Sequence, residues 1–367
     1  MQALILVGGE GTRLRPLTSR VPKPVIALAG RPFMSYMLQW LRGHGVDRVI
    51  LSCGFLPDGV RAVLGDGAEW GVELTYVEEP RPLGTGGALK YAGDLLDERF
   101  FMLNGDVLTD IDLTAQLAQH QATGARATLA LYPVDDPSGY GLVRRREDHS
   151  VREFVEKPSP EEIDTHLINA GAYILERAVL EEMGPAGSRS SIERDLFPRL
   201  VDRGLYGYAA SGYWMDIGTP QRYLQATWDI LESEVRTAVG AAISEAHGVL
   251  CHGDRPAGTI HGPAVIGPGC TIAPDASVTG RTVLGAGVRV GAGASIDGAV
   301  VLDGATIGDF TRVTRSIVGP GAWIGDHCRI EQLAMVGQDA RLGSGNTLTA
   351  GVRIFPEVDL PDGAIAF

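Results

Sequence analysis

The sequence predicts an α/β domain with a mostly parallel sheet, followed by a parallel β-helix made of hexapeptide repeats. Two observations support this prediction. As far as about residue 235, short apolar runs alternate with segments of helical periodicity, which is typical of βαβ units. After residue 250, one aliphatic residue recurs every six positions, which is the pattern of a solenoid with flat sides. A chain of 367 residues is long enough for both domains.

We expect residues 1–235 to form the first domain, 236–258 a linker and 259–367 the β-helix. The strands expected in the first domain are Arg48–Ser52, Val72–Val77, Phe100–Asn104, Ala127–Tyr132 and Ala170–Leu175. The expected helices are Pro32–His44, Gly84–Leu95, Leu113–Thr123, Ser191–Val201 and Pro220–Glu232. Ligands of such sheets bind outside the carboxyl ends of the strands. The segments that follow the first strand and Asn104 are therefore expected to face one crevice.

The repeat positions of the second domain define its coils. Aliphatic residues six apart run from Ile266 to Leu302, and the period resumes from Ile324 to Ile354. Two single-residue slips lie between these runs, through Ile307 and Val313 to Val318. Because each flat side takes one hexad, we expect three hexads to make one coil. Glycines are expected at the corners, where tight turns favour them: Gly267, Gly285, Gly291, Gly308, Gly325, Gly337 and Gly343.

Composition argues against several classes of protein. The net charge of −13 disfavours nucleic acid, which needs a basic face, and also an anionic membrane surface. No apolar stretch approaches the roughly 20 residues needed to cross a bilayer, and the first apolar run is too short for a signal peptide. The four cysteines are scattered without a C-x-x-C pair, so neither a zinc site nor a disulfide framework is expected. We therefore expect a cytoplasmic protein without a nucleic-acid or membrane partner.

The start of the chain contains a candidate phosphate-binding loop. The apolar run Met1–Val7 reads as a buried strand, and the glycine-rich segment Gly8–Arg15 follows it. Glycine lets a backbone approach a bulky anion because it has no Cβ. Thr12, Arg13 and Arg15 add a hydroxyl group and two positive charges. The spacing of these glycines matches neither G-x-x-x-x-G-K-[ST] nor G-x-G-x-x-G, the two common nucleotide-binding motifs. A glycine-rich turn without a ligand is therefore the alternative.

Lysine usage supports phosphate chemistry independently. Only three of the 32 basic residues are lysines, namely Lys23, Lys90 and Lys157. Lys23 and Lys157 each precede a proline in the strings Val21–Pro24 and Val155–Pro158. A compact ammonium group meets a phosphate differently from a forked guanidinium. These two lysines are therefore candidate phosphate ligands, with chance placement as the alternative.

Together these motifs resemble the signature of the nucleoside-diphosphate-sugar pyrophosphorylases, also called sugar-1-phosphate nucleotidyltransferases. The order of motifs matches that family along nearly the whole chain: the glycine loop, Pro-Lys-Pro, Gly-Thr-Gly-Gly, Asn-Gly-Asp, Tyr-Gly, Glu-Lys-Pro, Asn-Ala-Gly and Trp-Met-Asp-Ile-Gly. The first half then resembles the family's Rossmann-like catalytic domain. The second half resembles the left-handed β-helix appended to many of its members, which we interpret as an assembly and regulatory domain that makes a homo-oligomer.

The resemblance implies in-line attack by a sugar-1-phosphate oxygen on the α-phosphorus of a nucleoside triphosphate, with release of pyrophosphate. The nucleophile is already anionic, so the protein needs only to align two polyanions and neutralise charge, which cations and Mg²⁺ can do. Arg13 would meet the leaving pyrophosphate and Lys23 the reacting phosphates. Asp106 and Asp216 would hold the metal. The alternatives are a turn or helix cap for Asp106 and an N-cap role for Asp216 before the expected helix.

The remaining residues of the matching motifs are implied to contact the substrates. For the nucleotide they are Val7, Gly8, Gly9, Gly11, Thr12, Arg13, Glu78, Leu83, Gly84, Thr85 and Gly105. For the sugar phosphate they are Gly141, Glu156, Lys157, Asn169 and Gly171. In the family, the Gly-Thr-Gly-Gly loop wraps the nucleobase. Glu156 and Asn169 would hold sugar hydroxyls, and Lys157 would pair with the sugar's phosphate. A weak surface ion pair is the alternative for Glu156 and Lys157.

The motifs look most like those of mannose-1-phosphate guanylyltransferases with a β-helix, which implies GTP and mannose-1-phosphate as substrates and GDP-mannose as product. Glu10 inside the loop, Gly86 where alanine is common and Gly105 where serine is common depart from the family pattern. Glucose-1-phosphate thymidylyl- or uridylyltransferase and heptose-1-phosphate guanylyltransferase therefore stay open. From other classes, a β-helix acyltransferase and a non-catalytic regulatory subunit also stay open. His261 and His327, the histidines within the repeats, do not lie in an acyltransferase string.

Overall fold

The computed structural model describes residues 1–366, which divide into two compact units. The first unit comprises Met1–Gly9 and Met34–Trp214. The second comprises Glu10–Phe33 and the chain from Met215 onward. Most of the predicted phosphate loop thus belongs to the same compact unit as the β-helix. The predicted boundaries 1–235, 236–258 and 259–367 stay predictions. The segment 236–258 contains helix α7 (Ala238–Glu245) and strand β14 (Val249–Cys251).

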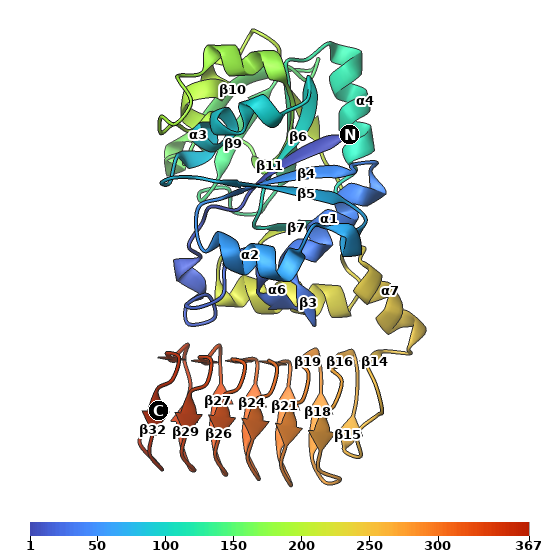
Figure 1. Cartoon of the computed structure of the whole chain (residues 1–367), viewed down its shortest axis with the longest axis vertical. Helices are drawn as coiled ribbons and strands as arrows, with labels where there is room; N and C mark the ends of the chain where they lie inside the picture. The colour runs from blue at the N-terminus through green and yellow to red at the C-terminus, as the bar shows by residue number, and fades with distance from the viewer. Residues whose placement is uncertain (367) are drawn as a thin grey trace. The chain divides into compact units, whose positions relative to one another are not determined.

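A nine-stranded sheet forms the centre of the first unit (Figure 1). Strands β6 (Arg99–Asn104), β1 (Gln2–Leu6), β4 (Arg48–Cys53) and β5 (Glu73–Glu78) lie side by side in this order, and all are parallel. The predicted parallel core is therefore confirmed. The loops after β1, β4, β5 and β6 leave the sheet at one edge, because the carboxyl ends of parallel strands lie together.

The other half of this sheet is largely antiparallel, which the sequence analysis did not anticipate. Strand β11 (Leu167–Glu176) runs antiparallel to β6, to β8 (Ala127–Pro133) and to β9 (Gly141–Arg145). Strand β10 (Val151–Glu156) pairs antiparallel with β9, and β12 (Leu205–Ala209) pairs parallel with β8. A buried strand reads as an apolar run whichever way it points. Residue pattern therefore located these strands without giving their direction.

Helices cover both faces of the sheet. Helix α4 (Leu113–Thr123) packs on the face that carries the side chain of Thr128, since His120 contacts the Thr128 hydroxyl at 2.8 Å. The alternate residues of the same strands face the other side. There Tyr173 and its neighbours form a core with helices α3 (Gly84–Tyr91) and α5 (Phe197–Leu200).

The predicted helices of the first half are present, α4 with the predicted ends and the others with shifted ends. They are α1 (Phe33–Gly43), α3 with the short turn Gly93–Leu95, α4, the π-helical turn Ile192–Leu196 continued by α5, and α6 (Pro220–Leu231). Helix α2 (Pro57–Leu64) was not predicted. It begins with a proline at its first position, which is a recognised start signal.

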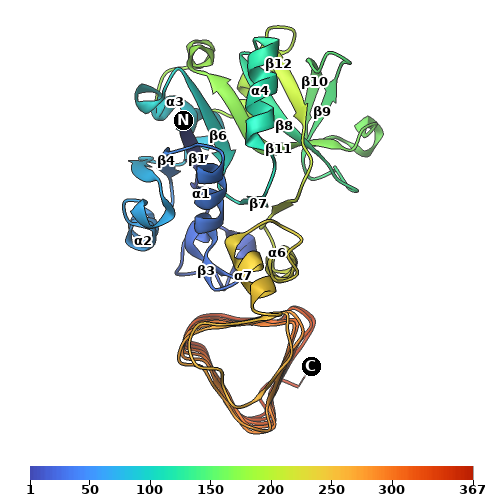
Figure 2. The same cartoon turned by 90° about the vertical axis from the view of Figure 1, so that its right-hand side faces the viewer.

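The chain after residue 248 winds into a parallel β-helix of three sheets, whose cross-section is triangular (Figure 2). The first sheet runs from β14 to β31 (Arg353–Ile354), the second from β15 (Thr259–Ile260) to β30 (Thr347–Leu348), and the third from β17 (Thr271–Ile272) to β32 (Asp359–Leu360). The fold predicted for this half, the left-handed β-helix with three hexads per coil, is thus confirmed.

The positions of the inward residues match the prediction with one exception. Val301, and not Leu302, belongs to the core of the β-helix, and it pairs in register with Leu284. The first single-residue slip therefore lies between Ile296 and Val301, one repeat earlier than predicted. Val301 and Leu302 are adjacent aliphatic residues, so spacing alone could not distinguish them. Leu302 lines a cavity outside the β-helix core.

The predicted corner glycines are explained by close stacking of coils and not by turn conformation. An added Cβ on Gly308 would lie 2.5 Å from Asp326 Oδ1 and 2.6 Å from the carbonyl carbon of Gly325 in the next coil. The positive φ values occur at other glycines, such as Gly287 with φ 66°. The glycine at position 308 is therefore needed because a neighbouring backbone approaches it closely.

One side of the β-helix is covered by other parts of the second unit. In the sheet from β14 to β31, the side chains that alternate with the core residues point outward. These outward residues are in register and almost fully buried: Val265, Val283, Val300, Ile317 and Met335. Helix α6 lies over this side, where Trp228 Nε1 donates a hydrogen bond to the Gly298 carbonyl at 3.1 Å.

Candidate functional site

The glycine loop in the second unit is fixed by hydrogen bonds to its own neighbours. Gly11 has φ 61°, and its carbonyl accepts hydrogen bonds from Thr18 Oγ1 at 2.7 Å and from the Leu14 amide at 2.9 Å. An added Cβ on Gly11 would lie 3.3 Å from Lys23 Cβ. The loop therefore folds back so that Gly11 lies against Lys23, which is buried, while Arg13 is exposed.

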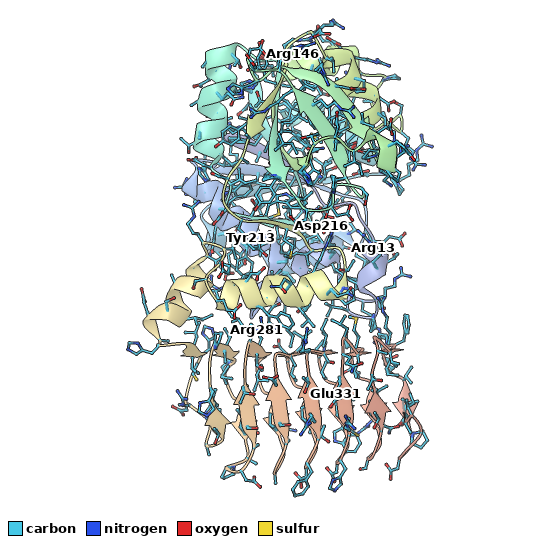
Figure 3. The ribbon with its side chains drawn as sticks, turned by 180° about the vertical axis from the view of Figure 1, so that it is seen from behind. Arg13, Arg146, Tyr213, Asp216, Arg281 and Glu331 are labelled. Carbon is cyan, nitrogen blue, oxygen red and sulfur yellow. The ribbon has the colours of Figure 1, made fainter. Side chains whose placement is uncertain are left out.

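Arg13 lies against the segment that contains Asp216. An added Cβ on Gly218 would lie 2.7 Å from Arg13 Nη2, so the guanidinium rests on the bare backbone of Gly218. Asp216 forms an ion pair with Arg222, and its side chain is 18% exposed. Figure 3 labels Arg13 and Asp216. Arg13 thus contacts the chain two residues after Asp216, although these two predicted catalytic residues are distant in the sequence.

The structure also identifies the N-cap of α6. The hydroxyl of Thr219 accepts a hydrogen bond from the Arg222 amide at 3.3 Å. Thr219 therefore takes the capping position that was the alternative role for Asp216. The carboxylate of Asp216 is left for a charged partner, which here is the guanidinium of Arg222.

The negative charge of Glu10, which departs from the family pattern, is neutralised locally. Glu10 Oε2 lies 3.3 Å from Arg15 Nη2, and both side chains are exposed. Arg15 thus compensates an acidic residue within the loop. The pair explains how a glutamate is tolerated within the predicted phosphate loop.

In the first unit, the backbone at the ends of β1 and β6 leaves no space for side chains. The Gly105 amide donates to the Leu6 carbonyl at 2.9 Å, and an added Cβ on Gly105 would lie 2.5 Å from that carbonyl oxygen. Gly54, after β4, is also close to a neighbouring backbone but less tightly packed, because its Cβ would lie 3.2 Å from Gly8 Cα. In this chain only glycine fits at 105, which accounts for one departure from the family pattern.

Glu79 connects the loops at these strand ends, and sequence reasoning missed it. Its Oε1 accepts a hydrogen bond from Ser52 Oγ at 3.0 Å, and its Oε2 accepts from the Leu83 amide at 2.9 Å. Glu78, which was predicted to bind nucleotide, pairs with Arg61 at 2.9 Å on an exposed surface. Adjacent residues at a strand end face opposite sides. The Glu78-Glu79 string was visible in the sequence, but its pattern did not say which carboxylate faces the loop.

The Gly-Thr-Gly-Gly loop packs closely on the segment Ser188–Glu193. The amides of Gly86 and Gly87 donate to the Ser190 carbonyl at 3.0 and 3.3 Å. Thr85 Oγ1 donates to Glu193 Oε2 at 2.7 Å. The backbone amides of Gly86 and Gly87 are thus already used inside the protein.

The same packing explains the second departure from the family pattern. An added Cβ on Gly86 would lie 2.7 Å from Ser190 Oγ and 3.1 Å from the carbonyl carbon of Ser191. Alanine at this position would require Ser190 and its backbone to move. Gly86 is therefore matched to a local contact in this chain.

The residues predicted to hold the sugar fall into two neighbouring pairs. An added Cβ on Gly141 would lie 3.0 Å from Glu156 Oε2, so the Glu156 carboxylate lies beside the Gly141 backbone. Asn169 Nδ2 donates to the Tyr173 hydroxyl at 2.9 Å, and its Oδ1 accepts from the Gly171 amide at 3.2 Å. The amide of Asn169 is thereby held in a fixed orientation.

Trp214, which was not predicted as a site residue, contacts the strand that carries Asn169 and Gly171. Its Nε1 donates to the Ala170 carbonyl at 2.8 Å. Its ring stacks on Tyr132 and meets Tyr140 edge-on, with centroids 5.7 and 5.4 Å apart. Ala170 lies between Asn169 and Gly171, so the aromatic cluster supports the strand that bears the predicted sugar ligands.

Glu156 has a raised pKa, and Lys157 has an unusual backbone conformation. Burial raises the pKa of Glu156, and the carboxylate of Glu193 raises it further, while Lys157 and Arg194 act in the opposite direction. Lys157 has φ 55°, in the left-handed region that a side-chain-bearing residue before proline rarely adopts. Strained backbone and shifted pKa values cluster at functional sites. Both observations favour a functional role over a relaxed surface ion pair.

Replacing Glu156→Gln should raise the melting temperature near neutral pH, with a gain that shrinks in acid. The folded state raises the pKa of this carboxyl above its unfolded value, so the folded protein binds more protons and the charged group costs stability as pH rises. Melting curves at about pH 4 and about pH 8 measure the effect. Glu153→Gln, which removes an exposed partner of Arg144, is the control. An equal difference at both pH values would contradict the expectation.

The described residues contain neither a cluster of metal-ligating side chains nor a membrane-spanning helix. Within residues 1–366, no group of three or more His, Cys, Asp or Glu side chains is placed to hold a metal ion. Among the same residues, no helix is both long and apolar enough to cross a bilayer.

Comparison with protein families gives two matches. The family model described as nucleotidyl transferase matches residues 2–233. The model described as GMPPB C-terminal domain matches residues 260–362.

Curated relatives match over nearly the full length. A mannose-1-phosphate guanylyltransferase of Mycobacterium tuberculosis is 38% identical, covering 100% of this chain and 98% of the relative. A probable mannose-1-phosphate guanylyltransferase of Oryza sativa is 36% identical over 93% of this chain and 92% of its own. A mannose-1-phosphate guanyltransferase of Schizosaccharomyces pombe is 36% identical over 92% and 91%.

Solved structures match the first part of the chain. HddC from Yersinia pseudotuberculosis is 30% identical with a TM-score of 0.54, covering 62% of this chain and 97% of that protein. Its complex with GMP-PN is 29% identical with a TM-score of 0.52 and the same coverage. Given the glycine loop, the tightly packed strand ends and these full-length relatives, the chain belongs to the nucleotidyl transferase family.

Proposed function

We propose that the protein transfers GMP from GTP to mannose-1-phosphate, giving GDP-mannose and pyrophosphate. The main support is the match over essentially the whole chain to a relative named mannose-1-phosphate guanylyltransferase. The complex of HddC with GMP-PN gives further support, because a guanine nucleotide occupies a structurally similar protein.

The chemistry needs alignment and charge neutralisation. A phosphate oxygen of mannose-1-phosphate forms a bond to the α-phosphorus of GTP, while the bond between that phosphorus and the oxygen bridging to the β-phosphate breaks. The electron pair leaves with pyrophosphate. We assign the exposed guanidinium of Arg13 to this leaving group and the ammonium of Lys23 to the reacting phosphates. The anionic nucleophile requires no general base.

The nucleotidyl transferase family generally uses a divalent metal ion. We propose Mg²⁺, held by Asp106 and Asp216, because hard carboxylate oxygens are its preferred protein ligands. Asp216 suits this role, since its carboxylate is partly exposed and it stands two residues before Gly218, which Arg13 contacts. When bound, the ion neutralises phosphate charge. A pair of carboxylates is enough, because Mg²⁺ usually keeps several waters and binds substrate phosphates.

We assign nucleotide binding to the two glycine-rich loops and sugar-phosphate binding to the Tyr-Gly, Glu-Lys-Pro and Asn-Ala-Gly motifs. The backbones of Val7–Gly9, Gly11–Arg13, Leu83–Thr85 and Gly105 would surround the nucleotide. Within the Gly-Thr-Gly-Gly loop, the base contacts fall to Gly84 and Thr85, since Gly86 and Gly87 donate to Ser190. The side-chain oxygens of Glu156 and Asn169 would accept hydrogen bonds from sugar hydroxyls. Gly141 and Gly171 would border the sugar, and Lys157 would pair with its phosphate.

We also propose a cytoplasmic location and self-association through the β-helix. Four free thiols, at Cys53, Cys251, Cys270 and Cys328, fit a reducing compartment. A stacked solenoid presents repeated surfaces for association, and Phe310 and Trp323 are large apolar side chains exposed on this one.

A substrate panel tests the proposed function. GTP, dTTP, UTP, CTP and ATP are each combined with mannose-1-phosphate, glucose-1-phosphate or a heptose-1-phosphate, and pyrophosphate release is measured. Release with GTP and mannose-1-phosphate at far higher kcat/KM than with any other pair is expected. Preference for dTTP or UTP with glucose-1-phosphate, or for a heptose, would replace the proposal. Release with no pair would favour a regulatory subunit, and turnover of an acyl-CoA would favour an acyltransferase.

A further inference from the structure

The buried outward column of the β-helix ends in a charged residue. Val265, Val283, Val300, Ile317 and Met335 occupy successive rungs of one sheet, and Arg353 is in register with Met335 on the next rung. Five apolar side chains meet the covering segments, whereas the sixth is an exposed arginine. The change from apolar to cationic occurs beside the glycine loop.

Arg353 bonds directly to the backbone of that loop. Its Nη1 donates to the carbonyl of Arg13 at 3.0 Å and to the carbonyl of Arg15 at 2.8 Å. These carbonyls flank Leu14, which is fully buried. Hydrogen bonds from a charged donor are about twice as strong as neutral ones. One guanidinium nitrogen therefore spans the turn that presents Arg13.

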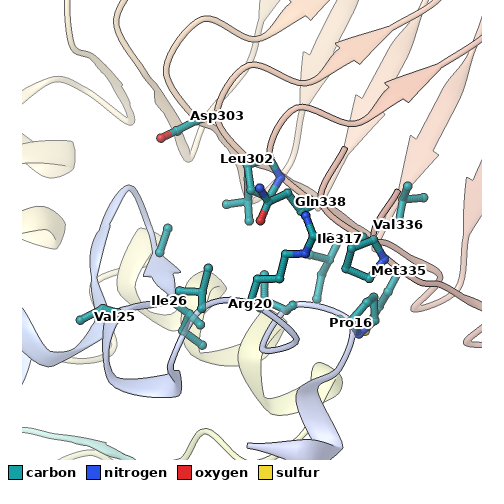
Figure 4. Close-up of a pocket in the computed structure, with 17 residues that line it drawn as sticks. Pro16, Arg20, Val25, Ile26, Leu302, Asp303, Ile317, Met335, Val336 and Gln338 are labelled. Carbon is teal, nitrogen blue, oxygen red and sulfur yellow. The ribbon is translucent and has the colours of Figure 1, made fainter. Parts of the chain in front are cut away.

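Packing alone does not hold this part of the chain in place. A cavity of about 170 Å³ lies between residues 16–27 and the β-helix, lined by Pro16, Leu302, Ile317 and Met335 among others (Figure 4). The side chains that line this cavity have no protein atoms packed against them on that side. Directional bonds lie at the edge of the region, from Arg353 and from Arg20, which pairs with Glu357 at 2.6 Å. The loop is thus fixed by polar contacts to the last coils.

We propose that Arg353 is a positioning residue for nucleotidyl transfer. By holding the carbonyls of Arg13 and Arg15, it keeps the Arg13 guanidinium against Gly218, beside Asp216. This inference rests on the proposed function, in which Arg13 meets the leaving pyrophosphate. It assigns a part in turnover to a coil that lies more than 300 residues away in sequence.

The test compares Arg353→Met with Arg353→Lys. Methionine keeps an unbranched chain without a donor, whereas lysine restores a cation that can donate to two carbonyls. We expect Arg353→Met to lower kcat about ten- to a hundredfold, since small misplacements of catalytic groups have effects of this size. KM for mannose-1-phosphate should stay within about twofold, and Arg353→Lys should recover part of kcat. Arg341→Met, at the outward position of a neighbouring sheet, is the matched control and should retain kcat.

Hydrogen exchange gives a readout that does not depend on activity. In Arg353→Met, amides of residues 10–20 should exchange faster than in the parent, while the other coils of the β-helix keep their protection. Unchanged kcat and unchanged exchange in Arg353→Met would overturn the inference. An equal loss of kcat in Arg341→Met would also overturn it, by showing a general effect of removing arginines.

A parallel Arg13→Met variant separates this inference from the proposed function. If Arg13→Met is inactive and Arg353→Met is fully active, only the role of Arg353 fails. If Arg13→Met retains full activity, the proposed role of Arg13 fails. Arg353 then has no catalytic effect through Arg13, even if residues 10–20 exchange faster in Arg353→Met.

Discussion

Replacing Asp216→Asn should lower pyrophosphate release on the order of a thousandfold, as loss of a preorganised charge at a transition state does. Asparagine keeps the size of the side chain but removes the negative charge that we assign to metal binding. In the structure the same change weakens the ion pair with the partly exposed Arg222. The melting temperature should therefore change little.

The control for this experiment is Asp275→Asn, which removes an exposed carboxylate from the β-helix. Binding of Mn²⁺ to the enzyme with GTP, followed by electron paramagnetic resonance, should weaken in Asp216→Asn and not in the control. Asp106→Asn should behave like Asp216→Asn, whereas full activity in either variant would contradict the metal assignment.

Replacing Gly308→Ala should destabilise the β-helix by about 2–3 kcal/mol, the cost of forcing a methyl group into close-packed structure. The new Cβ would meet Asp326 Oδ1 and the Gly325 carbonyl carbon at about 2.5 Å. That Asp326 oxygen also accepts a hydrogen bond from the Asp309 amide at 2.8 Å. Relief of the clash would therefore separate two coils and weaken the bond between them.

Chemical denaturation of the full chain measures this loss, with Gly287→Asn as the control. Gly287 has positive φ, but an added Cβ there meets nothing within 4 Å, and asparagine tolerates the left-handed region better than most residues. If Gly287→Asn lost as much stability as Gly308→Ala, turn conformation and not coil spacing would explain the glycines.

Sequence pattern predicted the features that repeat and missed those set by tertiary contacts. The hexapeptide period predicted the three-sided coil, because each side of a coil needs one inward-facing aliphatic residue. That need is visible in the local sequence. The covered side was not predicted, although the sequence holds apolar pairs such as Val283-Leu284 and Ile317-Val318, in which the second residue fills the core and the first faces out. The antiparallel half of the sheet had no comparable signal.

The candidate site shows the same contrast. Arg13 and Asp216 belong to sequence motifs and were therefore predicted as site residues. The contact of Arg13 with Gly218, two residues after Asp216, is seen only in the folded chain. Glu79 and Arg353 act on backbone amides and carbonyls, whose positions depend on the surrounding fold. A residue that bonds to backbone does not constrain the identity of its partner, so no complementary residue reveals the contact of Arg353 with the loop or that of Glu79 with the Leu83 amide. The Ser52 hydroxyl that also bonds to Glu79 is 27 residues away in sequence and forms no motif with it.

The number of stacked coils also sets the distance between two contacts of the β-helix. Trp228 is bonded at Gly298, next to the rung of Val300 at the middle of the covered side, and Arg353 reaches the loop three rungs further along. At about 4.8 Å per rung this separation is about 14 Å. Inserting one whole coil between these points would leave every hexad satisfied, yet would carry the guanidinium a full rung past its two carbonyls. The length of the solenoid in this interval is thus as much a part of the chemistry as any single side chain.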